Sequence, residues 1–141
     1  MPTTLEINLM LEGRTGTSPA QLTVYRQDWW EDGFDIEAIS EEHNQRPQYW
    51  LRLTGHNAPK KGTYRLDGDD DREDRLLIEF GLYNRDVQPI ENGAFILESI
   101  EFNQRSLKGE FEFTWEHDDE KVEVQCWDLE VLSPSTHDHE P

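Results

Sequence analysis

Apolar and polar residues alternate with a period of two along the last third of the chain. From residue 107 to residue 116 every second position is apolar or glycine, and the positions between them are Lys, Glu or Thr. The apolar side of this pattern consists of Leu107, Gly109, Phe111, Phe113 and Trp115. Because successive side chains of a strand point to opposite faces, the pattern predicts a β-strand with one buried and one solvated face.

A second apolar run precedes this strand and a third follows it, with breaks of only a few residues. The breaks at residues 103–106 and 117–120 have lengths that suit hairpin turns. We therefore predict an antiparallel meander of three strands between residues 94 and 132.

The last of these strands changes its parity. Val122 and Val124 define its apolar face, but Trp127, Leu129 and Val131 continue that face in the alternate positions. One inserted residue produces such a change, so we predict a β-bulge near residues 125–127.

The same alternation predicts strands over most of the remaining chain, at residues 5–11, 21–25, 49–54, 64–66 and 76–83. Residues 33–47 fit two descriptions. Phe34, Ile36 and Ala38 alternate like a strand, whereas Asp35 could cap a short helix with Ile36 and Ile39 on one face. Strands on both sides favour the strand.

Eight or nine strands with at most one short helix predict an all-β fold, either an antiparallel β-sandwich or a closed barrel. The length of 141 residues suits one domain. We place this domain at residues 1–132 and expect residues 133–141 to form a disordered tail, because the tail is short, polar and rich in Pro and His.

The charge of the chain narrows its possible partners. Thirty-one acidic residues against thirteen Lys and Arg give a formal net charge of -18 at pH 7. Such a field repels nucleic-acid phosphates and anionic membranes and attracts basic proteins, so we expect no nucleic acid and no membrane as partner. The acidity either serves solubility or adaptation to salt, or it forms a docking surface for a basic protein.

Cysteine usage and the N-terminal residues indicate the compartment. Cys126 is the single cysteine, so no intramolecular disulfide can form, and its place in a strand pattern predicts a packed thiol. Residues 1–12 lack a basic segment of the kind that opens a signal peptide, and no apolar run is long enough to span a membrane. We expect a cytoplasmic protein.

Residues that could carry chemistry do not form a convincing motif. Asp67, Asp69 and Asp71 stand at alternate positions as in a calcium loop, but Arg72 and Ile78 occupy the positions that need Gly and Glu. These three aspartates are weak candidates, and we expect no metal site and no cofactor. The cluster at residues 117–120 is explained better as a hairpin turn than as an acid–base pair. We therefore predict that the protein is not an enzyme.

The function expected from these observations is a non-enzymatic binding protein that docks a basic protein partner on an acidic surface, as a toxin-neutralising, immunity-like protein or as an adaptor. The candidate contact residues combine the polar face of the meander with three tryptophans; they are Glu110, Glu112, Glu116, Glu123, Trp29, Trp30 and Trp50.

One alternative function uses the aromatic residues instead of the charge. A ligand-binding β-barrel or a carbohydrate-binding β-sandwich would present exposed rings or a cavity. Trp50 alternates with the apolar side of its strand and should therefore point to the opposite face, where Tyr25 could join it in an aromatic platform.

Overall fold

The computed structural model is an all-β protein, which confirms the predicted fold class. It describes residues 4–11, 18–40, 48–66, 73–82, 90–117 and 120–132. Nine strands and no helix are found in these ranges: β1 (Thr4–Leu11), β2 (Ser18–Trp30), β3 (Gly33–Ser40), β4 (Tyr49–His56), β5 (Gly62–Arg65), β6 (Arg75–Leu82), β7 (Ile90–Glu101), β8 (Ser106–His117) and β9 (Glu120–Val131). No helix in the described ranges could therefore cross a membrane.

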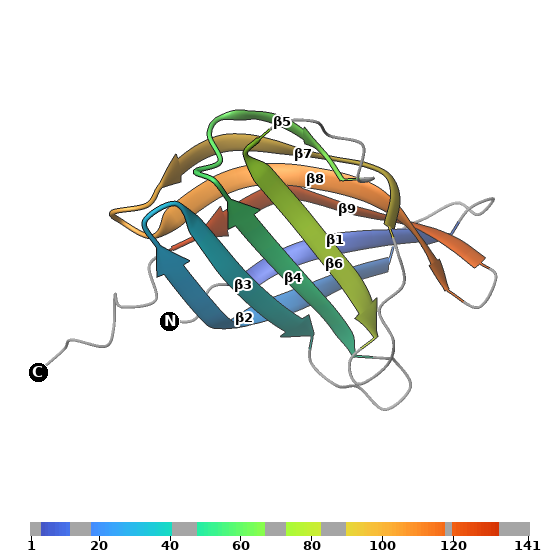
Figure 1. The fold of residues 1–141 in the computed structure, drawn as a ribbon. Helices are drawn as coiled ribbons and strands as arrows, with labels where there is room; N and C mark the ends of the chain where they lie inside the picture. Colours follow the sequence, from blue (N-terminus) through green and yellow to red (C-terminus); the bar gives the residue numbers. More distant parts are fainter. Residues whose placement is uncertain are drawn as a thin grey trace, which may run out of the picture.

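The nine strands form one antiparallel sheet in the order β5-β7-β8-β9-β1-β2-β3-β4-β6. The sheet curls until it is nearly closed into a barrel, with β4 and β6 in front and β8 and β9 behind them in Figure 1. Of the sandwich and the closed barrel that the sequence left open, the structure is nearer to the barrel: it is one sheet, with β5 and β6 as its two edges. The predicted tail at residues 133–141 lies outside the described residues.

The predicted C-terminal meander is confirmed. Strands β7, β8 and β9 pair antiparallel in succession, and the apolar side of β8 is buried throughout. The bulge in β9 is also present. Leu129 pairs with Gly109 and Cys126 pairs with Phe111, so two residues of β9, Trp127 and Asp128, stand opposite Glu110 alone.

This bulge corrects one prediction. The sequence pattern placed Trp127 on the apolar face, but its side chain is 56% exposed, while Cys126 and Leu129 are both buried. The strand changes parity at residues 127 and 128, at and just beyond the predicted end of the bulge. Because neighbouring positions of a strand face opposite sides, so small a displacement moves the indole from the interior to the surface.

The segment that fitted either a strand or a helix is strand β3. Phe34, Ile36 and Ala38 are buried on its inner side, and β3 pairs with β2 and β4 along most of its length. The β2–β3 ladder contains a bulge at Tyr25, which leaves that side chain on the outer surface beside Arg26. The prediction of a strand is correct.

Aromatic rings fill much of the described interior. Phe80 of β6 lies 4.9 Å from Trp115 and 5.5 Å from Phe113 of β8, measured between ring centroids, so side chains of the front and back strands meet across the barrel. Stacked rings extend this contact in both directions, to Tyr49 at one end and through Phe111 to Phe95 at the other. Burial of so much ring surface stabilises the barrel mainly through the hydrophobic effect.

Candidate functional site

The outer surface of β8 and β9 carries all four glutamates predicted to bind a partner. We call it the acidic face and define it by the outward charged side chains of these strands that the structure describes, together with Trp127: Lys108, Glu110, Glu112, Glu116, Lys121, Glu123, Asp128 and Glu130. Six of these are acidic and two are basic. Side chains directly opposite each other on paired strands lie about 5 Å apart, well within the Debye length of about 8 Å at physiological salt, so their fields add.

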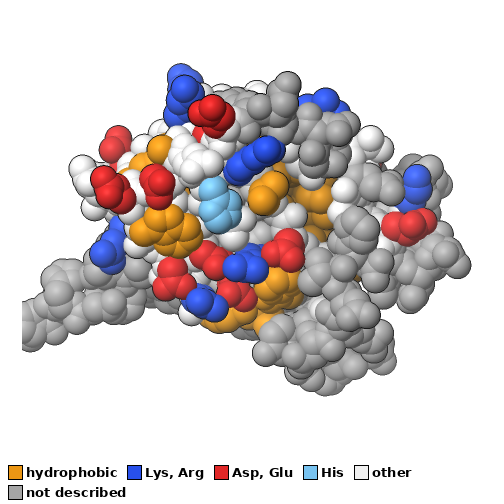
Figure 2. Space-filling view, viewed as in Figure 1, with side chains coloured by type: hydrophobic (Ala, Val, Ile, Leu, Met, Phe, Trp, Pro, Cys, Tyr) orange, Lys and Arg blue, Asp and Glu red, His pale blue; other side chains and the backbone are white. Residues whose placement is uncertain are grey.

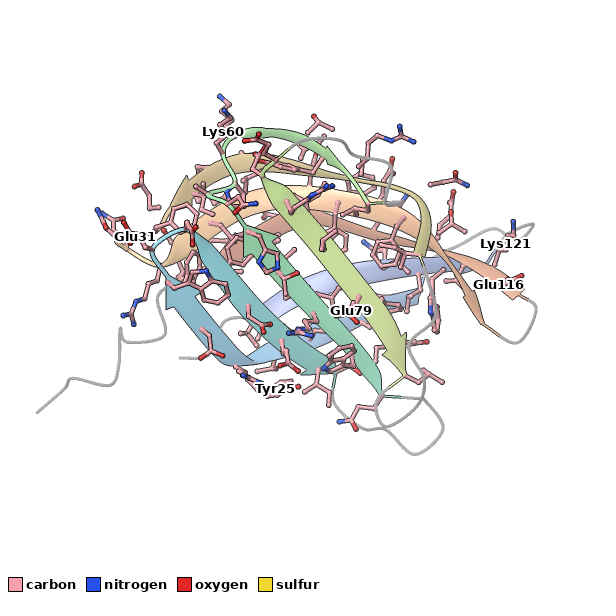
Figure 3. The ribbon with its side chains drawn as sticks, viewed as in Figure 1. Tyr25, Glu31, Lys60, Glu79, Glu116 and Lys121 are labelled. Carbon is pink, nitrogen blue, oxygen red and sulfur yellow. The ribbon has the colours of Figure 1, made fainter. Side chains whose placement is uncertain are left out.

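The two lysines of the acidic face lie toward its ends. Lys108 forms an ion pair with Glu130, with 3.5 Å between Nζ and Oε2. Lys121 stands opposite Glu116 near the end of the β8–β9 hairpin, where Figure 3 shows both side chains. Glu112 and Glu123 instead face the neutral residues Gln125 and Thr114. The centre of the face therefore keeps an uncompensated negative charge.

A shallow depression lies beside Trp127. It has a volume of about 90 Å³ and is lined by Ala94, Ile96, Glu110, Phe111, Glu112 and Trp127. The register explains its composition, because Glu110 pairs with Ile96 and Glu112 with Ala94 on β7, while the β9 bulge adds the indole from the other side. Ile96 is 42% exposed, so the site combines an apolar surface with two carboxylates.

Trp127 and Ile96 were absent from the predicted contact residues. Ile96 lies on the outer side of β7, opposite Glu110, where the sequence gives no reason to expect a large apolar side chain to be exposed. Trp127 was assigned to the interior. The sequence did contain one signal for the exposure of Trp127. Asp128 follows it directly, and the two residues stand between Cys126 and Leu129, which are buried on the same strand. A charged residue at this position indicates that both side chains point outward.

The outer surface of β2, β3, β4 and β6 is different, because four of its carboxylates form ion pairs with two arginines, Arg26 and Arg52. Arg52 binds Asp35 through two hydrogen bonds, from Nε at 3.0 Å and from Nη2 at 2.8 Å, and its Nη1 lies 3.3 Å from Glu79. The hydrogen bonds from Arg52 lower the pKa of Asp35 below its ordinary value. We call this surface the arginine face; Figure 2 shows its acidic and basic side chains interspersed.

Trp50 lies on the arginine face, as predicted from the alternation of β4. Its indole Nε1 is 3.1 Å from the Tyr25 hydroxyl and 3.1 Å from Glu37 Oε1, and the Tyr25 hydroxyl donates to the same Glu37 oxygen at 2.8 Å. The second oxygen of Glu37 accepts from Arg26 at 3.1 Å. The expected proximity of Trp50 and Tyr25 is confirmed, and Glu37 joins them into one hydrogen-bonded cluster.

The other two predicted tryptophans lie at the end of β2. Trp29 is half-buried; its ring packs 5.1 Å from Phe34 and 6.1 Å from Phe102, and its Nε1 donates to Gln27. Trp30 points outward, with its indole over Gly33 and its ring centroid 6.4 Å from that of His56. Trp29 thus contributes to the core, whereas Trp30 lies on the surface.

The structure does not gather all the predicted contact residues on one surface. The four glutamates lie on β8 and β9, whereas Trp29 and Trp30 lie on β2, two strands beyond β9 in the sheet, and Trp50 lies on β4, four strands beyond it. The tryptophan that accompanies the glutamates is Trp127. A single partner that contacts the acidic face would therefore meet Trp127 and not Trp50.

Most of the residues considered for metal binding and catalysis lie outside the described part of the chain. Asp67, Asp69 and Asp71 lie outside the described residues, as do Asp118 and Asp119 of the predicted turn. In the parts of the chain that are described, no group of three or more His, Cys, Asp and Glu side chains could hold a metal ion. Cys126 is fully buried, and this burial raises the pKa of its thiol to about 12.

Comparisons of this chain with protein-family models, with curated proteins and with solved structures found no match. Any functional argument therefore depends on the two outer faces of the barrel.

Proposed function

We propose that this chain is a non-enzymatic binding protein that docks a basic protein partner on the acidic face, either to neutralise it or to act as an adaptor. The observation that supports this proposal is the position of Trp127: the most exposed tryptophan of the chain stands among six acidic side chains. Buried tryptophans supply much of the affinity of protein interfaces, and surrounding charges select the partner and speed its approach.

The contrast between the two faces supports the choice of surface. On the arginine face, Asp28, Glu37 and Asp35 each already form an ion pair with an arginine. Glu110, Glu112 and Glu123 have no hydrogen bond or ion pair with another described residue. A basic partner therefore gains most by approaching β8 and β9, where it neutralises charge without breaking internal ion pairs.

The test uses charge reversal with a matched control. The full chain carrying Glu112→Lys and Glu123→Lys is compared with a chain carrying Glu31→Lys and Glu73→Lys, two exposed residues that belong to neither β8 nor β9. Both variants change the net charge equally. Proteins from the source cell that bind at low salt are captured, identified and cross-linked to the chain.

We expect the captured proteins to be basic, to be lost at high salt, and to cross-link to β8 and β9. The first variant should lose them and the control should keep most of them. Equal losses from both variants would reduce the effect to net charge and contradict the proposal, as would cross-links confined to β2–β6.

One observation favours a second candidate function, a carbohydrate-binding surface on the arginine face. Tyr25 is 51% exposed and lies beside Trp50, with Glu37 and Arg26 at its edge. Exposed rings with polar neighbours are the elements that hold a sugar ring. Titration with soluble oligosaccharides such as cellohexaose should then change the tryptophan fluorescence of the natural chain and not that of Tyr25→Ala; an unchanged natural spectrum would reject this candidate.

A further inference from the structure

We propose that the depression beside Trp127 receives one arginine side chain of the partner, with the guanidinium against the indole and its N–H groups directed to Glu110 and Glu112. This inference rests on the proposed function, since it specifies which basic group the acidic face recognises.

The size of the depression limits what can enter it. Sites for cofactors and drug-sized ligands usually measure about 300–1,000 Å³. The volume here is about 90 Å³, and the lining comes from three neighbouring strands of one curved sheet. Such a space suits the head group of a single side chain that projects from a larger partner.

The lining selects for a cation. Trp127 is the one tryptophan of the five that makes neither a hydrogen bond nor a ring contact with any described residue. Its ring is thus accessible to a cation, which the negative face of an indole attracts.

The carboxylates of Glu110 and Glu112 are equally available. No described cation pairs with them, and Lys108, two positions before Glu110 on β8, is engaged by Glu130. An incoming cation would therefore meet two carboxylates and an aromatic face without displacing an existing partner.

Arginine fits this arrangement better than lysine. The guanidinium is planar, so it can lie on the indole and on the apolar surface of Ile96 while its edge donates several hydrogen bonds to carboxylates. A lysine ammonium is more strongly hydrated and has no planar face to stack. Because two acceptors and one ring converge here, we expect a preference for arginine and not merely for positive charge.

Nuclear magnetic resonance of the indole N–H groups tests this inference directly. The ¹⁵N-labelled full chain is titrated with acetyl-Gly-Arg-Gly-amide and, separately, with its lysine counterpart, and Trp127→Phe identifies the Trp127 signal. We expect the arginine peptide to shift that signal with an affinity at least fivefold higher than the lysine peptide, while the signals of the other tryptophans stay in place.

Paired variants supply the control. Glu110→Gln with Glu112→Gln should weaken the arginine peptide about tenfold or more, whereas Glu116→Gln with Glu123→Gln, which removes the same charge elsewhere on the acidic face, should weaken it less than twofold. Equal affinity for the two peptides, or equal effects of the two double variants, would overturn the inference. Capture of basic proteins is measured in a separate experiment. Capture without a preference for the arginine peptide would refute the arginine site alone, and a preference for the arginine peptide without capture would refute the proposed function alone.

Discussion

Trp50 of β4 and Tyr25 of β2 lie side by side across β3, with 3.1 Å between the indole Nε1 and the tyrosine hydroxyl. The residue that holds them together is Glu37 of the intervening strand, which accepts hydrogen bonds from both and, through its other oxygen, from Arg26. Three strands are thereby joined on the outside of the barrel.

Because Glu37 serves three donors, its removal should cost more than the removal of one donor. We expect Glu37→Ala to lower the free energy of unfolding by about 1–2 kcal/mol. Tyr25→Phe should lower it by about 0.5 kcal/mol or less, because Tyr25 is half-exposed and water can replace the lost hydroxyl as a hydrogen-bond partner. Urea unfolding followed by circular dichroism measures both. Equal losses would contradict the central role assigned to Glu37.

The Arg52–Asp35 pair should make stability depend on pH in the acidic range. Arg52 lowers the pKa of Asp35 in the folded chain, so the unfolded chain takes up a proton first as the pH falls. The stabilisation is therefore complete above about pH 5 and is lost as the pH drops through and below the ordinary aspartate pKa of about 3.9.

Asp35→Asn should remove this contribution, about 1 kcal/mol at pH 7, a modest value because the Arg52 side chain is 38% exposed. Unfolding curves at pH 7 and pH 3.5 should show the difference between the natural chain and the variant shrinking at the lower pH. Asp28→Asn is the control, since Asp28 pairs with Arg26 on the surface, where both side chains are more than half exposed, and it should change neither curve measurably. A difference that stays constant with pH would contradict the assigned cause.

Regular strands could be predicted from the sequence, but the pairing of strands that are far apart in the sequence could not. Strand β8 follows directly from its period of two, and so does the outward position of Trp50. The choice between sandwich and barrel depends on pairings such as that of β1 with β9, which join residues more than a hundred positions apart and leave no local trace. The cluster around Glu37 was likewise invisible, because it requires the registers of β2, β3 and β4 together.

The acidic face shows the same limit. Its glutamates follow from the alternation of β8 and β9, but Trp127 does not, because the bulge that exposes it could be located from sequence only to within a few residues. A shift of one residue exchanges the buried and exposed positions of a strand. That uncertainty was therefore enough to assign the Trp127 side chain to the wrong side of the sheet.

Gly109 is required by close packing. A Cβ atom at this position would lie 2.5 Å from the carbonyl oxygen of Ile96 and 2.8 Å from the ring of Phe95. A backbone atom cannot rotate away, so we expect Gly109→Ala to destabilise the chain by about 2–3 kcal/mol through forced displacement of β7. Thr114→Ala, an outward position on the same strand, should cost about 0.5 kcal/mol or less. Thermal unfolding compares the two, and similar midpoints would refute the packing argument.

Cys126 should be inert in the folded protein and reactive only after unfolding. Its side chain is buried on β9 opposite Phe111, and burial raises the pKa of the thiol to about 12. The thiolate is the form that reacts with Ellman's reagent, so labelling at pH 8 should be negligible in buffer and should follow the unfolding curve in urea. Rapid labelling of the natural chain in the absence of urea would show that the thiol is accessible after all.

The buried thiol should also make stability depend on pH in the alkaline range. The unfolded chain ionises this thiol above about pH 8.5, whereas the folded chain keeps it protonated, so stability should fall as the pH rises from about 9 toward 12. Cys126→Ala should show a shallower fall over this range.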